Sequence, residues 1–126
     1  MPRLPESVIQ NWDKLKHDLL PFIDKLNDPM LSSDFKKELK KKVEALYGQF
    51  DSGLKDKLKK VNSAKTDQDA KAALKVVIPI VQDYDAKVKA KQTEWGTNGK
   101  AIIDKFDRCL TTIKGECQKA LQALGG

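Results

Sequence analysis

Histidine and cysteine, which commonly perform catalysis, are scarce in this chain of 126 residues. Its single histidine, His17, stands between Lys16 and Asp18 and off the apolar positions of its segment, so we expect it on the surface. The two cysteines, Cys109 and Cys117, are eight residues apart, which is not the spacing of zinc ligands. We therefore expect neither a metal ion nor any other cofactor.

Motifs of nucleotide-binding and di-iron proteins are missing as well. The glycines in residues 95–100 have neither the spacing of a phosphate-binding loop nor a preceding strand. The Glu-x-x-His pairs of di-iron helical bundles are absent. Asp104 and Asp107 would share a helix face, but Lys100 and Arg108 lie on it too, which indicates solvated ion pairs. The sequence predicts a protein that is not an enzyme.

Arginine is rare although the chain is basic. The formal net charge is +6, and Arg3 and Arg108 are the only arginines beside 22 lysines. Recognition of nucleic-acid bases usually depends on bidentate arginine, so we expect no nucleic-acid partner. Lysine can still attract an acidic protein or an anionic membrane surface. The densest group of lysines consists of Lys36, Lys37, Lys40, Lys41, Lys42, Lys55, Lys57, Lys59 and Lys60.

Long apolar runs are also lacking. No stretch approaches the ~20 apolar residues of a membrane-spanning helix, and the first residues carry no apolar core of a signal peptide. Along a helix, Cys109 and Cys117 would be about 12 Å apart, too far for a disulfide. Reduced thiols fit a reducing compartment, so we expect a soluble cytoplasmic protein, with a mature secreted form as the alternative.

Apolar residues are present at spacings of three and four, the signature of amphipathic helices. Asn27-Asp28-Pro29 should end the first helix, Ser32 or Ser33 should cap the second, and Thr66 should cap the third. Gly96 should act as the left-handed C-cap of the third. Helices are predicted over about 6–26, 33–61, 67–95 and 98–124.

Four such helices joined by short connections predict an all-α, single-domain antiparallel four-helix bundle with up-down-up-down topology. Asp51-Ser52-Gly53 weakens the second helix, but its apolar pattern continues across this triplet and favours one long helix. Residues 76–81 are apolar and β-branched enough to resemble a strand, yet helical spacing on both sides favours helix.

Two stretches carry more apolar residues than one helix stripe can bury, and each contains a proline that should kink its helix. Counted from the predicted helix starts, Pro21 and Pro79 should lie at nearly the same level of the bundle. The sequence thus predicts a mid-bundle apolar belt that binds a partner or ligand. Its residues are Leu20, Pro21, Phe22, Val76, Ile78, Pro79 and Ile80.

Three interpretations of this belt remain open. It could dock a protein partner or a second copy of the chain, as an adaptor, chaperone-like, effector or inhibitor protein would. It could instead hold a lipid or another hydrophobic ligand, in a bundle whose lysine-rich amphipathic helices associate with a membrane surface. Or it is the best-buried layer of the core. We favour a non-catalytic protein–protein interaction module.

Overall fold

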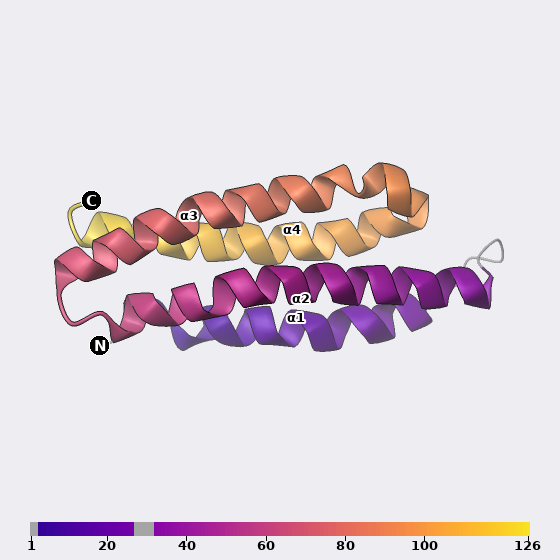
Figure 1. The fold of residues 1–126 in the computed structure, drawn as a ribbon, viewed down its shortest axis with the longest axis horizontal. Helices are drawn as coiled ribbons and strands as arrows, with labels where there is room; N and C mark the ends of the chain where they lie inside the picture. The colour runs from indigo at the N-terminus through magenta and orange to yellow at the C-terminus, as the bar shows by residue number, and fades with distance from the viewer. Residues whose placement is uncertain (1–2, 27–31) are drawn as a thin grey trace.

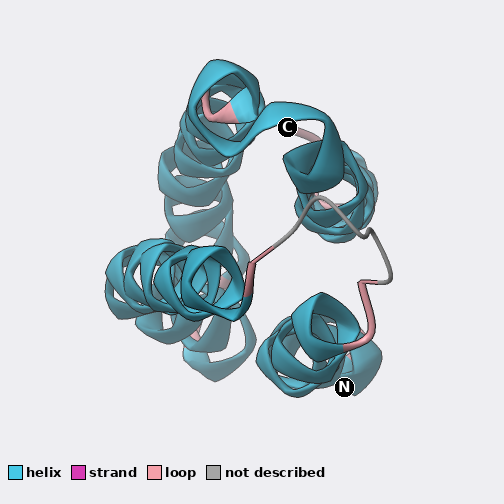
Figure 2. Ribbon diagram, turned by 90° about the vertical axis from the view of Figure 1, so that its right-hand side faces the viewer, coloured by secondary structure: helices cyan, strands magenta, loops and turns pink. Residues whose placement is uncertain are grey.

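The computed structural model describes residues 3–26 and 32–126, without the side chain of Asn98. It is an all-α single domain whose four long helices run in alternating directions (Figure 1). Viewed along its axis, each helix lies beside two others (Figure 2). Asn27, Asp28 and Pro29 lie outside the described residues. The helices are α1 (Glu6–Asp24), α2 (Ser33–Ser63), α3 (Asp67–Ala90) and α4 (Gln92–Ala123).

Two of the helix starts are capped as the sequence predicts. The Ser32 hydroxyl accepts a hydrogen bond from the backbone N–H of Phe35 at 3.1 Å, and the Thr66 hydroxyl accepts one from Asp69 at 3.1 Å. Each bond satisfies one of the N–H groups that a helix start leaves without an intrahelical partner. The predicted continuity of α2 across residues 51–53 and the helical state of residues 76–81 are also confirmed.

The boundary between the last two helices differs from the predicted one. We expected the third helix to reach Trp95, but α3 ends at Ala90 and α4 begins at Gln92. Gly96 then interrupts α4 with φ 69° and ψ −163°, a backbone region that is essentially restricted to glycine. Lys91 keeps helical dihedral angles, φ −74° and ψ −9°, so the break in helical geometry is at Gly96. The positive φ expected of Gly96 is present, but it lies inside α4 and not at the end of α3.

A single apolar core fills the space between the helices, and no polar or charged residue among those described is buried within it. Trp12, Phe50, Phe106 and Trp95 lie in it, as their helical spacing predicts. Phe35 lies four residues before the core residue Leu39, a spacing that predicts a place on the core face of α2, but it is 38% exposed near the start of that helix. Both α1 and α3 continue through their prolines, and the kinks remain a prediction.

Candidate functional site

The seven residues of the predicted belt differ widely in exposure. On α1, Leu20 and Phe22 are half-buried and Pro21 is exposed. The ammonium group of Lys105 lies 4.8 Å from the centre of the Phe22 ring, so α4 covers part of this group. On α3, Val76 is 51% exposed. Pro79 is exposed too, whereas Ile78 and Ile80 are half-buried.

The structure does not bring the two proline segments to one level. Near Pro21, Asp24 of α1 pairs with Lys40 in the first half of α2. Near Pro79, Val76 of α3 lies against Lys57 and Lys60 in the second half of α2. The expectation of a common level is therefore wrong, and the belt forms two separate surfaces.

The reason is a shift between α1 and α3 along the bundle. Trp12, early in α1, stacks on Tyr47 of α2 with ring centres 4.7 Å apart. One turn further along α2, Phe50 stacks at 4.1 Å on Tyr84, which lies late in α3. At the end of the bundle that holds the C-terminus, α3 extends beyond the start of α1 (Figure 1). The prediction of a common level for Pro21 and Pro79 required α1 and α3 to begin at the same level of the bundle, and they do not.

An exposed, largely apolar stripe runs along the outside of α3. Its six positions follow one another at spacings of four and three, and all six are exposed. Five of them are apolar, which is unusual on the surface of a chain with 33% charged residues. We call it the outer stripe; its residues are Ala72, Val76, Pro79, Asp83, Ala86 and Ala90.

Lysines border this stripe on the side of α2. Lys57 and Lys60 form, with Ala73 and Val76, a hollow of about 130 Å³. Among the described residues, neither of these two lysines nor Lys75 takes part in an ion pair. Residues 55–75 contain seven lysines and three aspartates, so this region is strongly cationic.

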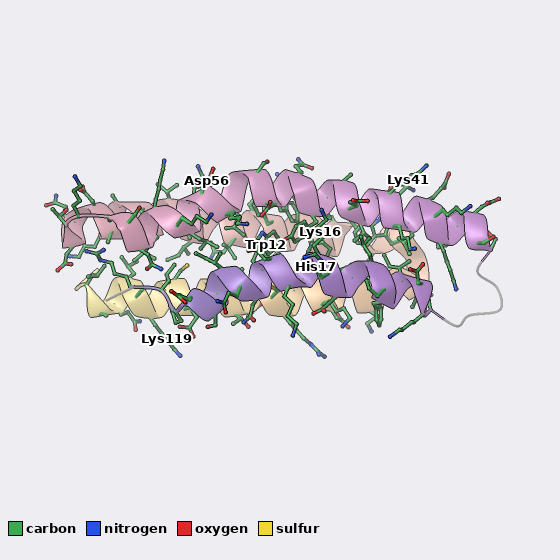
Figure 3. All side chains as sticks on the ribbon, turned by 90° about the horizontal axis from the view of Figure 1, so that it is seen from below. Trp12, Lys16, His17, Lys41, Asp56 and Lys119 are labelled. Atoms are coloured by element: carbon green, nitrogen blue, oxygen red, sulfur yellow. The ribbon has the colours of Figure 1, made fainter. Side chains whose placement is uncertain are left out.

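A second hollow lies between the first and last helices. It is an open groove of about 340 Å³ between α1 and α4. Sequence reasoning missed it because it depends on how two helices at opposite ends of the chain are placed. Figure 3 views the molecule from the side of α1, with α2 along one edge and α4 along the other. The groove is lined by Val8, Asn11, Lys14, Leu15, Asp18, Lys105, Arg108, Cys109, Thr112 and Ile113.

A polar cluster joins α1 to α2 at the level of Trp12. The Trp12 indole N–H donates to Asp51 at 2.8 Å, and the Tyr47 hydroxyl donates to the Trp12 carbonyl at 2.7 Å. Burial, followed by the nearby carboxylates of Asp51 and Asp13, raises the pKa of Tyr47 well above its usual value. Asp13 also pairs with Lys55 at 3.0 Å. This cluster holds the two helices together and presents no open cavity of its own.

Several groups of the described residues have a pKa shifted by burial or by a neighbouring charge. Burial raises the pKa of the Cys109 thiol to about 11 and, with a smaller effect of Glu116, that of Cys117 to about 12. Both thiols are therefore protonated near neutral pH and are poor nucleophiles. Burial and hydrogen bonding to Asp107 raise the pKa of Asp85, but Lys89 pairs with both carboxylates. This arrangement is that of an ion-pair cluster.

The described residues offer neither a metal site nor a membrane-spanning helix. Among them, no group of three or more histidine, cysteine, aspartate or glutamate side chains could hold a metal ion. In the same part of the chain, no helix is long and apolar enough to cross a membrane. Comparison of the chain with protein-family models, with curated proteins and with solved structures found no match.

Proposed function

We propose that this protein is a non-catalytic interaction module that docks an acidic amphipathic helix of a protein partner on the outer stripe of α3. The observation that carries the proposal is the 51% exposure of Val76 in the first half of this stripe. Val76 and Phe35 are the exposed large apolar side chains among the described residues. Of the predicted belt, Val76 and Pro79 would contact the partner directly, and Ile78 and Ile80 would support them from the edges.

The shape of the stripe suits a helix. Alanines at positions 72, 86 and 90 allow a partner helix to approach closely, because the distance between packed helices depends on the side chains at the contact. Pro79 also lacks the N–H that would satisfy the Lys75 carbonyl, so this carbonyl remains free to accept a hydrogen bond. The kink that the sequence predicts at Pro79 of α3 is part of this proposal.

The charge around the stripe favours an acidic partner. Lys57, Lys60 and Lys75 lie at its border without ion pairs within the described structure. Such rim charges raise the association rate and disfavour partners of the same sign more than they add affinity. Leu20, Pro21 and Phe22 lie on the other surface and are not part of the proposed contact.

Paired variants test the proposal. Partners captured from the native source by the wild-type protein are purified, and their dissociation constants are measured directly by calorimetry. Val76→Glu should weaken binding at least tenfold, since it removes the exposed half of a side chain worth about 1.5 kcal/mol on full burial and places a carboxylate against an acidic partner. Lys57→Glu with Lys60→Glu should weaken it too, most strongly at low salt. The control Lys16→Glu with Lys119→Glu changes charge equally on α1 and α4, and should have little effect.

Circular dichroism of each variant must show unchanged helicity. If partners bind all variants alike, or the control alone weakens binding, the outer stripe is not the docking surface. Analytical ultracentrifugation identifies the case in which the partner is a second copy: the wild type would then dimerise and Val76→Glu would not.

Association with an anionic membrane surface is a second candidate, favoured by the four net positive charges of residues 55–75. Flotation with anionic and with neutral vesicles tests it. Binding to anionic vesicles that disappears in Lys57→Glu with Lys60→Glu would support this candidate over the protein partner. Absence from both vesicle fractions would remove it.

A further inference from the structure

We propose that the groove between α1 and α4 binds a single-chain anionic amphiphile, with the chemistry of a medium-length fatty acid. This site is separate from the outer stripe of α3, and neither proposal depends on the other.

The floor of the groove is apolar. Val8 and Leu15 of α1 and Ile113 of α4 belong to the core, and their outward surfaces line the groove. Cys109 is half-buried between them, and its Sγ lies 3.9 Å from the Asn11 carbonyl oxygen. Because its pKa is raised by burial, the thiol is neutral and adds no charge to the floor. An alkyl chain could therefore lie here without burying an unpaired charge.

The charged residues gather toward one end. Since α1 and α4 run in opposite directions, the Lys105 end of α4 lies beside the later residues of α1, and its Ile113 end lies nearer to Val8. Lys105 thus lies at the Asp18 end, Lys14 and Arg108 lie nearer the middle, at the level where Cys109 contacts Asn11, and Val8 and Ile113 mark the apolar end. Three cationic side chains and one carboxylate leave an excess of positive charge where a head group would sit.

These cationic groups are free to meet a ligand. Within the described residues, Lys14, Lys105 and Arg108 take part in no ion pair. Lys14 and Arg108 are exposed at the rim, and Lys105 is held over the Phe22 ring. A carboxylate head group complements this charge.

The size of the groove is consistent with one alkyl chain. Its volume of about 340 Å³ is at the lower end of the range of small-molecule sites. Its lining extends from Val8 to Asp18, which corresponds to roughly 15 Å along α1. A folded peptide helix is about 10–12 Å wide and would not enter a groove of this volume.

Two-dimensional ¹H–¹⁵N NMR with decanoate, kept below its micelle concentration, tests the proposal. Saturable shifts should be confined to the amides that line the groove, among them Asn11, Cys109 and Thr112. Decyltrimethylammonium, which has the same chain and the opposite charge, should bind at least tenfold more weakly. Equal binding of the two compounds, or decanoate shifts spread over all four helices, would overturn the proposal.

Variants separate head-group recognition from general charge. Lys14→Glu with Arg108→Glu should weaken decanoate binding at least tenfold, whereas Lys100→Glu with Lys119→Glu, an equal change outside the groove, should not. Thr112→Trp fills the groove from an exposed position and should abolish the shifts while circular dichroism stays unchanged. Equal weakening by both charge variants would contradict a specific site. The proposal would also be contradicted if ultracentrifugation showed a doubled mass and decanoate caused no shifts, because a dimer contact would then cover the groove.

Discussion

Replacing Asp51 with alanine should destabilise the bundle, because the carboxylate is the acceptor for a buried tryptophan. The Trp12 side chain is 0% exposed, and its indole N–H donates to Asp51 at 2.8 Å. Asp51→Ala removes this acceptor and leaves the N–H without a partner in an apolar environment. Tyr47 stacks on the ring at 4.7 Å and fixes its position, so the indole N–H keeps its direction when the carboxylate is removed.

The size of the effect follows from two opposing contributions. A hydrogen bond to a charged group contributes about 1.5–3 kcal/mol to stability. Alanine is the better helix former, and within α2 it should recover about 0.5 kcal/mol. The net loss in the free energy of unfolding is therefore about 1–2.5 kcal/mol, which lowers the melting temperature by roughly 4–9 °C for a chain of this length.

A double-mutant cycle separates the hydrogen bond from other effects of the substitution. Trp12→Phe removes the N–H and keeps an aromatic ring against Tyr47, so in this background Asp51→Ala should cost less than about 0.5 kcal/mol. Asp56→Ala is the matched control, because Asp56 is exposed in the same helix (Figure 3). Urea denaturation followed by circular dichroism measures all the variants. If Asp51→Ala is no more destabilising than Asp56→Ala, or costs the same in both backgrounds, the hydrogen bond does not stabilise the fold as described.

Two further predictions concern backbone conformation and pH. Gly96→Ala should lower the free energy of unfolding by about 1–3 kcal/mol, because φ is 69° at this position. Gly48→Ala, in an open helical position, should raise it by about 0.5–1 kcal/mol. Urea denaturation measures both variants, and equal effects would contradict this prediction. Because the pKa of Tyr47 is higher in the folded than in the unfolded state, the unfolded chain releases this proton first, and stability should fall as pH rises above about 10. Thermal melts between pH 8 and 11 should show a smaller decrease for Tyr47→Phe than for the wild type, and identical slopes would refute the assignment.

Those parts of the fold that depend on local periodicity were predictable from the sequence. Apolar residues at helical spacing identified four helices and most of the core, including Trp12 and Trp95. The caps at Ser32 and Thr66 were predictable because a cap acts within three residues of itself. Asp51 was misjudged: its residue type suggested only a weak point in α2, whereas a buried Trp12 on the facing helix needs a hydrogen-bond acceptor there.

Properties that depend on the placement of whole helices were not predictable. The shift of α1 against α3 is set by side-chain stacking on α2, so counting residues from helix starts could not detect it. The groove between α1 and α4 has the same origin, because its walls come from residues 8–18 and 105–113. The break at Gly96 was predictable because glycine tolerates a positive φ, but the end of α3 at Ala90 was not, since Trp95 lies seven residues after Val88 and continues the apolar period of α3.

Surplus apolar residues have opposite consequences in the two proline segments, and helical phase explains why. In α1, Ile23 follows the core residue Leu19 by four positions, so it adjoins the core stripe and is 0% exposed. In α3, Val76 follows the core residue Leu74 by two positions, a rotation of about 200° that places it on the opposite side of the helix. Its neighbours in the outer stripe share this phase, so packing α3 on its core face cannot cover them. Apolar composition alone therefore does not distinguish a core layer from a contact surface, but the phase relative to the core stripe does, and on α3 it favours contact.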